Sequence, residues 1–229
     1  MKRTNLFLAL FVVVSIGELL AVSMGWAEVH IVCKSLIMLS LIGYYLGEVP
    51  KRNSHFLRAM FFCWAGDVLL LKQSDDELYF ILGLVAFLIG HSLYILAYRQ
   101  LRWKETAAGL LMTQKIRAGF PVALAGTGLI VVLFPKLGGL TIPVIVYAIV
   151  LMVMVMTSFF RFGRTSGESF WFLAIGAILF MTSDAILAIN KFHTAFAMAG
   201  PLIMLTYVLA QYLIVEGGIR HSIPLKPTA

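Results

Sequence analysis

The chain is divided into long apolar runs that are separated by short polar connections. Each run has about 20 residues, the length that a helix needs to cross the hydrocarbon core of a bilayer. Hydrophobic residues make up 61% of the 229 residues and charged residues 13%, whereas soluble domains are about 45–50% apolar. The pattern therefore predicts an all-α integral membrane protein, and it argues against a soluble helical protein of unusually apolar composition.

Eight such runs predict a bundle of eight transmembrane helices in a single polytopic domain, residues 1–229. The first run follows Lys2-Arg3 and could be a signal peptide, but it continues to Trp26, so we expect it to be retained as a span. The predicted helices cover roughly residues 5–25, 28–48, 56–73, 77–98, 116–135, 140–160, 169–189 and 195–216.

The basic residues are distributed unevenly between the two sides of the predicted membrane. With the N-terminus inside, the inner connections hold fourteen Lys and Arg residues and the outer connections hold three. Cytoplasmic loops are enriched in basic residues, so both termini are predicted to be cytoplasmic. The inner residues are Lys2, Arg3, Lys51, Arg52, Arg58, Arg99, Arg102, Lys104, Lys115, Arg117, Arg161, Arg164, Arg220 and Lys226, and the outer ones are Lys72, Lys136 and Lys191.

The net charge of +7 arises from these loop residues. Basic residues in loops on one side of a membrane are suited to anionic lipid headgroups. Membrane lipids, and not nucleic acid, are therefore the expected partners.

A few ionisable side chains lie inside the apolar runs. Asp184, in the stretch Phe180–Phe192, has no basic residue within one helical turn. A charge at this depth is costly unless it is paired or faces a cavity, so each of these residues is expected to face the bundle interior. The ionisable residues are Glu18, Lys34, Asp67, His91 and Asp184, and their neutral polar neighbours are Tyr147, Asn190, Tyr207 and Gln211.

Helical rise assigns a depth to each of these residues. Asp67 and Asp184 lie roughly 7–9 Å below the predicted outer ends of their helices. Glu18, Lys34 and Tyr147 lie about 9–10 Å below the same surface. Because it would be costly for all five to face lipid, we expect them to converge in one layer.

Three carboxylates and one ammonium in that layer would leave an excess of negative charge. Like charges and removal from water both favour the protonated form of an acid. We therefore expect at least one protonated carboxyl group beside an ionised one, the arrangement used in paired acid/base chemistry. A structural alternative stays open, in which Lys34 neutralises one acid, Glu18 orients Lys34, and the remaining groups form a buried packing network.

His91 is predicted to lie deeper, about 20 Å from the outer end of its helix, with Tyr207 at a similar depth and Gln211 one turn further in. These residues either satisfy helix packing or form a second polar layer roughly 10–13 Å from the aspartates. An elongated amphiphile would fit between two such layers.

Other catalytic motifs are absent from the sequence. It has no GxSxG elbow, no HExxH, no Walker loop and no dinucleotide fingerprint. The two aspartates also differ from those of intramembrane aspartyl proteases. The segment Trp64-Ala65-Gly66-Asp67 lacks the first glycine of Gly-x-Gly-Asp, and Ser183-Asp184 replaces Tyr-Asp. We expect no metal and no organic cofactor.

Several short blocks, taken in their order and spacing, resemble the YhhN-type membrane proteins, a family that includes the animal lysoplasmalogenases. One departure is Lys34-Ser35, where the family often has Lys-Pro, and it affects the expected local shape of that helix. The resembling blocks are Gly66–Leu70, Phe87–Tyr94, Val146–Ala148, Gly176–Asp184, Asn190–Phe192 and Tyr207–Ile214.

The resemblance implies an eight-helix bundle that hydrolyses the vinyl ether bond of lysoplasmalogens. The products would be a fatty aldehyde and a glycerophospho-ethanolamine or glycerophospho-choline. The protein would lie in a plasma membrane, such as the bacterial inner membrane. Asp67 and Asp184 are implied as the catalytic pair. Lys34 would maintain their protonation states or meet the substrate phosphate. The expected pocket residues are His91, Tyr94, Tyr147, Asn190, Tyr207 and Gln211, with Glu18 in a supporting position.

Two other functions are compatible with buried carboxylates. A transporter or flippase of a lipid or small cation would use them as proton-coupling sites, and it would need broken helices. Pro121 and Pro143 lie near predicted helix ends, and only Pro201 lies well inside one. A structural or assembly protein would tolerate alanine at both aspartates.

Overall fold

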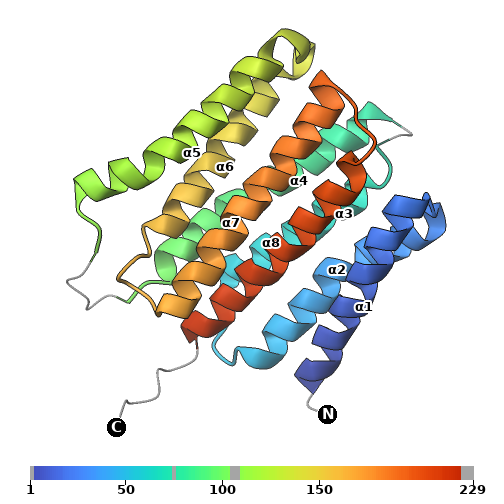
Figure 1. Cartoon of the computed structure of the whole chain (residues 1–229). Helices are drawn as coiled ribbons and strands as arrows, with labels where there is room; N and C mark the ends of the chain where they lie inside the picture. Colours follow the sequence, from blue (N-terminus) through green and yellow to red (C-terminus); the bar gives the residue numbers. More distant parts are fainter. Residues whose placement is uncertain (1–2, 74–75, 104–108, 223–229) are drawn as a thin grey trace.

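The computed structural model describes residues 3–73, 76–103 and 109–222. The predicted all-α fold is confirmed, because these residues form eight α-helices, two short 3₁₀ turns and one π-helical turn (Ile189–His193), with no strand among them. The α-helices are α1 (Arg3–Met24), α2 (Ala27–Glu48), α3 (Ser54–Leu70), α4 (Glu77–Gln100), α5 (Met112–Leu133), α6 (Thr141–Phe159), α7 (Gly167–Ala188) and α8 (Ala199–Ser222) (Figure 1).

Seven of these helices are long and apolar enough to cross a membrane. The exception is α3, which has 17 residues. Large apolar side chains face outward, among them Val13, which is 67% exposed, and Ile142, which is 75% exposed. A bundle with such an exterior is matched to lipid and not to water, so the chain is an integral, multi-pass membrane protein.

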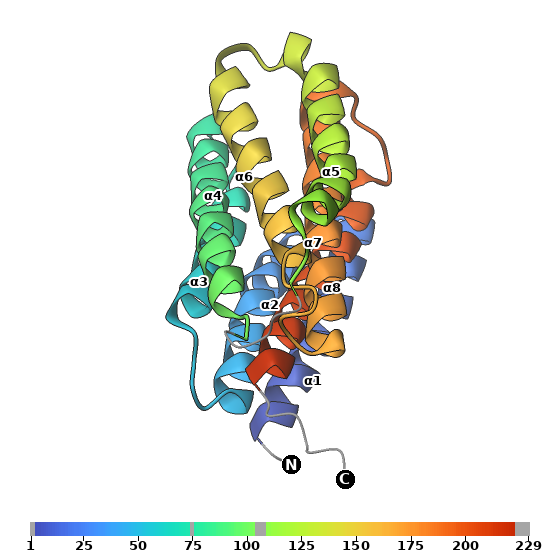
Figure 2. The same ribbon diagram turned by 90° about the vertical axis from the view of Figure 1, so that its left-hand side faces the viewer.

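The helices run up and down the bundle in chain order (Figure 1). The most extensive contacts are between α7 and α8, α3 and α4, and α1 and α2. The α1–α2 and α5–α6 pairs lie at opposite edges, and the remaining helices lie between them (Figures 1 and 2). Helix α1 begins and α8 ends at the same end of the bundle, which we call the basal end; the other is the distal end.

The basal and distal ends correspond to the predicted inner and outer sides. Their orientation relative to the cytoplasm stays a prediction, as does the crossing by α3. Three of the basic residues behind that prediction, Lys2, Lys104 and Lys226, lie outside the described residues.

Glycines allow α7 and α8 to approach closely. A Cβ atom at Gly176 would lie 2.8 Å from the backbone nitrogen of Ile214, and one at Gly217 would lie 2.8 Å from the backbone nitrogen of Leu173. Small residues at such contacts let helix backbones pack tightly in a membrane. The close contact fixes the register of the two helices that carry Asp184 and Tyr207, respectively.

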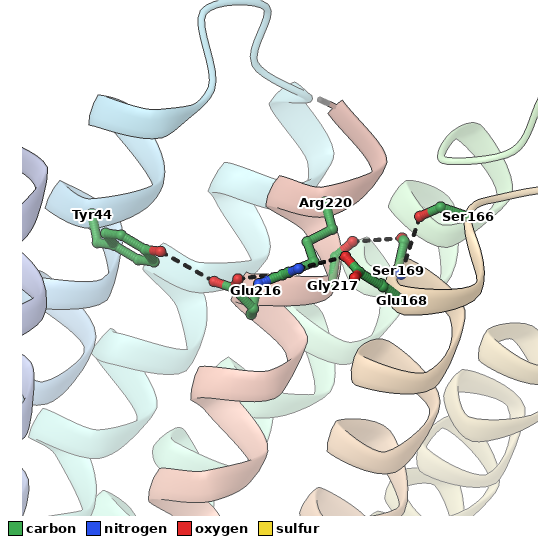
Figure 3. Close-up of polar contacts among 7 residues, drawn as sticks. All are labelled: Tyr44, Ser166, Glu168, Ser169, Glu216, Gly217 and Arg220. Atoms are coloured by element: carbon green, nitrogen blue, oxygen red, sulfur yellow. Dashed lines mark hydrogen bonds and ion pairs between the residues drawn. The ribbon is translucent and has the colours of Figure 1, made fainter. Parts of the chain in front are cut away.

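A polar network joins α2, α7 and α8 at the basal end (Figure 3). The buried carboxylate of Glu216 on α8 accepts hydrogen bonds from Tyr44 on α2, at 3.1 Å, and from Arg220, at 2.8 Å. Arg220 also pairs with Glu168 in the first turn of α7. These charged groups pair with one another and stabilise the basal ends of the helices.

Arg161, just after α6, is fully buried. Its guanidinium donates to the carbonyls of Leu101 and Ser169 at 2.9 and 3.2 Å, and to the hydroxyls of Ser169 and Thr165 at 2.8 and 3.3 Å. The Ser169 hydroxyl in turn donates to the carbonyl of Gly217 at 2.6 Å (Figure 3). Burial lowers the pKa of Arg161 to about 10. Arg161 therefore ties the α4–α5 connection, the α6–α7 connection and the first turn of α7 together through neutral acceptors.

Two prolines lie elsewhere than predicted. Pro121 is in the interior of α5, because that helix begins at Met112 and not near residue 116. Pro201 is in the first turn of α8, where a proline is tolerated, because α8 begins at Ala199 and not near residue 195.

Candidate functional site

A cavity of about 120 Å³ lies inside the distal half of the bundle. Residues from α2 through α8 line it, and most of them are apolar. An apolar wall with a few convergent polar groups is typical of a small-molecule site. The polar or charged lining residues are Lys34, Asp67, Gln73, Tyr147, Ser183, Asp184, Lys191 and Tyr207.

Asp67, near the C-terminal end of α3, is only 2% exposed. Its Oδ2 atom accepts a hydrogen bond from the Tyr207 hydroxyl on α8 at 2.5 Å. The Gln211 amide donates to the same hydroxyl at 3.2 Å. This chain of donors orients one carboxylate oxygen, while Oδ1 forms no hydrogen bond to any described residue and is free to meet a ligand.

Asp184 on α7 has a matching environment. The Tyr147 hydroxyl on α6 donates a hydrogen bond to its Oδ2 atom. The neighbouring Ser183 hydroxyl donates to the carbonyl of Ile203 on α8 at 3.0 Å and so anchors this part of α7. Each aspartate of the cavity is therefore held by a tyrosine from a different helix.

Four of the five polar residues that were expected to converge line this cavity: Lys34, Asp67, Tyr147 and Asp184. The expectation is wrong for Glu18, whose Oε1 atom lies 2.8 Å from Nδ1 of His30 at the start of α2. Helical depth alone does not show which way a side chain points, so it could not show that Glu18 turns to His30. Lys34 has no carboxylate within 4.0 Å among the described residues, so it neither pairs with Glu18 nor neutralises one aspartate directly.

Of the two alternatives for His91, Tyr207 and Gln211, the structure does not form the second polar layer. Tyr207 bonds to Asp67, and the His91 ring lies edge-on to Tyr147, with 5.4 Å between their centroids. Helical rise fixes the depth of Cα atoms only, and a tyrosine side chain leans toward the N-terminus of its helix, which in α8 is the distal end. His91 is fully buried outside the cavity lining, and neither ring nitrogen has a hydrogen-bond partner among the described residues.

Two further predicted pocket residues lie outside the cavity lining. Tyr94 is buried between the rings of Phe56 and Tyr98, at centroid distances of 5.3 and 5.6 Å. The Asn190 side chain accepts a hydrogen bond from the backbone of Phe196 at 3.2 Å and so holds the connection between α7 and α8. Both residues have packing roles in this geometry.

Lys191 lines the cavity, although its sequence position suggested only a helix end. It follows Asp184 by seven residues and belongs to the π-helical turn Ile189–His193, so regular helical spacing does not fix the direction of its side chain. No three His, Cys, Asp or Glu side chains are grouped as a metal site would require, within the part of the chain that the structure describes.

Comparison with known proteins gives a consistent match. The YhhN family profile matches residues 29–218. A lysoplasmalogenase of Mycobacterium bovis is 32% identical over 165 residues, and the match covers 67% of this chain and 59% of that protein. Human lysoplasmalogenase TMEM86B is 29% identical, and the match covers 83% of this chain and 76% of that protein. Bovine lysoplasmalogenase TMEM86A is also 29% identical, and the match covers 89% of this chain and 83% of that protein. No solved structure matches the chain significantly.

Proposed function

The chain belongs to the YhhN family, and on that premise we propose that it is a membrane-embedded hydrolase of a lysoplasmalogen-type, single-chain lipid. It cleaves the vinyl ether bond to give a fatty aldehyde and a glycerophospho-alcohol. The observation that carries the proposal is the placement of Asp67 and Asp184 on one cavity, each with a tyrosine hydroxyl bonded to one oxygen. The names of the family relatives support the substrate class.

The chemistry needs one acid and one base. A carboxylic acid transfers its proton to the alkene carbon next to the ether-bearing carbon, and an oxocarbenium ion forms. The second carboxylate stabilises this cation and then takes a proton from the water that attacks it, much as two carboxylates share the work in glycoside hydrolysis. The resulting hemiacetal collapses to the aldehyde and the alcohol. Asp67 and Asp184 divide these two roles.

The other cavity residues set the conditions for this step. Tyr147 and Tyr207 hold the two carboxyl groups in place, and the hydrogen bond to the ionised one is charge-assisted. The Lys34 ammonium on the same cavity balances part of the negative charge at a site of low dielectric. Gln211 acts through Tyr207, and His91 acts by packing against Tyr147.

The same proposal includes the orientation of the bundle. Eight crossings, with α3 as the shortest, put both termini in the cytoplasm, and the positions of the basic residues support this. The chain then lies in a plasma membrane, such as the inner membrane of a bacterium, with the cavity closer to the outer surface.

The test is aldehyde release from a vinyl-ether lysophosphoethanolamine by the purified, detergent-solubilised protein. Asp67→Asn and Asp184→Asn preserve shape but remove the acid, so each should lower turnover by about a hundredfold or more. Asp76→Asn is the matched control, because this exposed residue caps α4, where asparagine serves equally well. Full activity in either cavity variant, with an unchanged gel-filtration profile, would reject the mechanism.

A proton-coupled transporter or flippase is the second candidate. The feature closest to it is Pro121 in the interior of α5, yet α5 continues as one helix from Met112 to Leu133. In detergent a transporter yields no product, so aldehyde formation in the same assay decides between the two functions.

A further inference from the structure

A second hollow adjoins the aspartate cavity at the distal end of the bundle. Lys191 and Phe192 line both spaces, so they form the partition between them. Both residues belong to the π-helical turn Ile189–His193 at the end of α7. Such turns are rare and occur frequently at functional sites, because they redirect side chains that a regular helix would place elsewhere.

The distal hollow is charged, whereas the cavity behind it is mostly apolar. Glu77, Lys136 and Lys191 all line it. The Lys191 ammonium lies 3.9 Å from the centroid of the Phe80 ring, and the Lys136 ammonium donates to the carbonyl of His193 at 2.8 Å. Neither lysine has a carboxylate within 4.0 Å among the described residues, so both ammonium groups keep donors for an outside anion.

We propose that this distal hollow binds the zwitterionic headgroup of a single-chain phospholipid. Lys191 and Lys136 bind the phosphate, and Glu77 faces the headgroup amine, because two cations and one anion complement a phosphodiester that carries an amine. The identity of the lipid rests on the proposed function. The lipid enters from the distal end and passes the partition toward the two aspartates.

The spacing along α7 agrees with this arrangement. Lys191 follows Asp184 by seven residues, so it lies about 10 Å further along the axis. That separation leaves room for the glycerol backbone between a phosphate at Lys191 and a vinyl ether at the aspartates. Lys34 lines only the inner cavity, which Asp67 also lines. The phosphate contact therefore belongs to Lys191, and Lys34 acts on the carboxylates.

The test uses a saturated alkyl-ether lysophosphoethanolamine, which has no vinyl ether to hydrolyse, and measures its Kd for the full-length protein in detergent. Lys191→Met should weaken binding by about tenfold to a hundredfold, because a charged hydrogen bond is lost, and Lys136→Met should weaken it in the same direction. The control is Lys72→Met, since Lys72 is exposed at the same end and lines neither space. An unchanged Kd for Lys191→Met would overturn the proposal.

Two further measurements assign the headgroup and the source of the phosphate. Glu77→Gln should weaken binding of the ethanolamine lipid but not of the matching phosphoglycerol lipid. If the variant lost affinity for both lipids equally, the role of Glu77 would be rejected. Glycerophosphoethanolamine should bind at least tenfold more weakly than the lipid, because it lacks the chain that fills the apolar cavity. Equal affinity would mean that the hollow binds a soluble phosphodiester and would overturn its assignment to lipid.

Failure of this proposal is distinguishable from failure of the proposed function. If the wild type releases aldehyde but Lys191→Met leaves the Kd unchanged, only the headgroup site is rejected. Lysine-dependent binding without any aldehyde release rejects the hydrolase and keeps the site. With both correct, Lys191→Met raises KM about tenfold or more and leaves kcat nearly unchanged, since the phosphate contact is equal in ground state and transition state.

Discussion

Tyr207 and Asp67 lie 140 residues apart in the sequence, yet the tyrosine hydroxyl is 2.5 Å from the aspartate Oδ2 atom. The bond joins α8 to α3, and the bond from Tyr147 to Asp184 joins α6 to α7. The two acidic groups are therefore positioned by four helices. Neither half of the chain contains a complete set of these residues.

Removing either tyrosine hydroxyl should lower turnover without unfolding the protein. Tyr207→Phe and Tyr147→Phe each remove a hydrogen bond to a reacting carboxyl group, worth about 1–3 kcal/mol, so kcat should fall about fivefold to a hundredfold. Aldehyde release at saturating lipid measures the effect. Tyr79→Phe is the control, because Tyr79 lines neither space at the distal end. If both cavity variants kept wild-type kcat, the tyrosines would not orient the reacting groups.

The helices and the acidic layer could be predicted because both follow from one-dimensional patterns. Apolar runs of membrane length gave bounds within a few residues for most helices. Helical rise then placed Asp67 and Asp184 at similar depths, and the structure has both on one cavity. The cost of an unpaired intramembrane charge was a reliable reason to expect that they face inward.

The failures arose where the direction of a side chain decides the contact. Depth could not show that Glu18 turns to His30, or that the Tyr207 side chain reaches back to Asp67. Lys191 was missed because the π-helical turn that presents it has no sequence signature comparable to an apolar run. The direction of each side chain around its helix axis and the local irregularity of a helix are therefore what the sequence alone did not supply.

The contact between α7 and α8 should be sensitive to a single methyl group. Gly176→Ala puts a Cβ atom 2.8 Å from the Ile214 backbone nitrogen, and backbone cannot move aside cheaply. We expect a loss of about 1–3 kcal/mol in unfolding free energy and a lower thermal midpoint in detergent. Gly128→Ala is the control, because nothing lies within 4 Å of its added Cβ atom. Equal midpoints for the two variants would contradict the close approach.

Arg161 should not be replaceable by lysine. The three nitrogen atoms of its guanidinium donate to four neutral oxygen atoms. The single ammonium nitrogen of a lysine cannot reach all four. Arg161→Lys should therefore destabilise the protein by about 2–3 kcal/mol. Chemical or thermal unfolding in detergent measures this, with Arg117→Lys on the exposed face of α5 as the neutral control. A stable Arg161→Lys variant would show that the basal connections do not depend on the guanidinium geometry.

Helix α3 decides the topology, because it is the helix that falls short of the usual spanning length. If it crosses the membrane, the connections on either side of it are on opposite faces. Lys51→Cys and Leu78→Cys occupy exposed positions before and after α3 and can be made in a background without Cys33 and Cys63. A membrane-impermeant maleimide should label the cysteine at 78 in intact cells or spheroplasts, and the cysteine at 51 only after permeabilisation. Labelling of both from one side would mean that α3 does not cross, and the reverse pattern would place the termini outside.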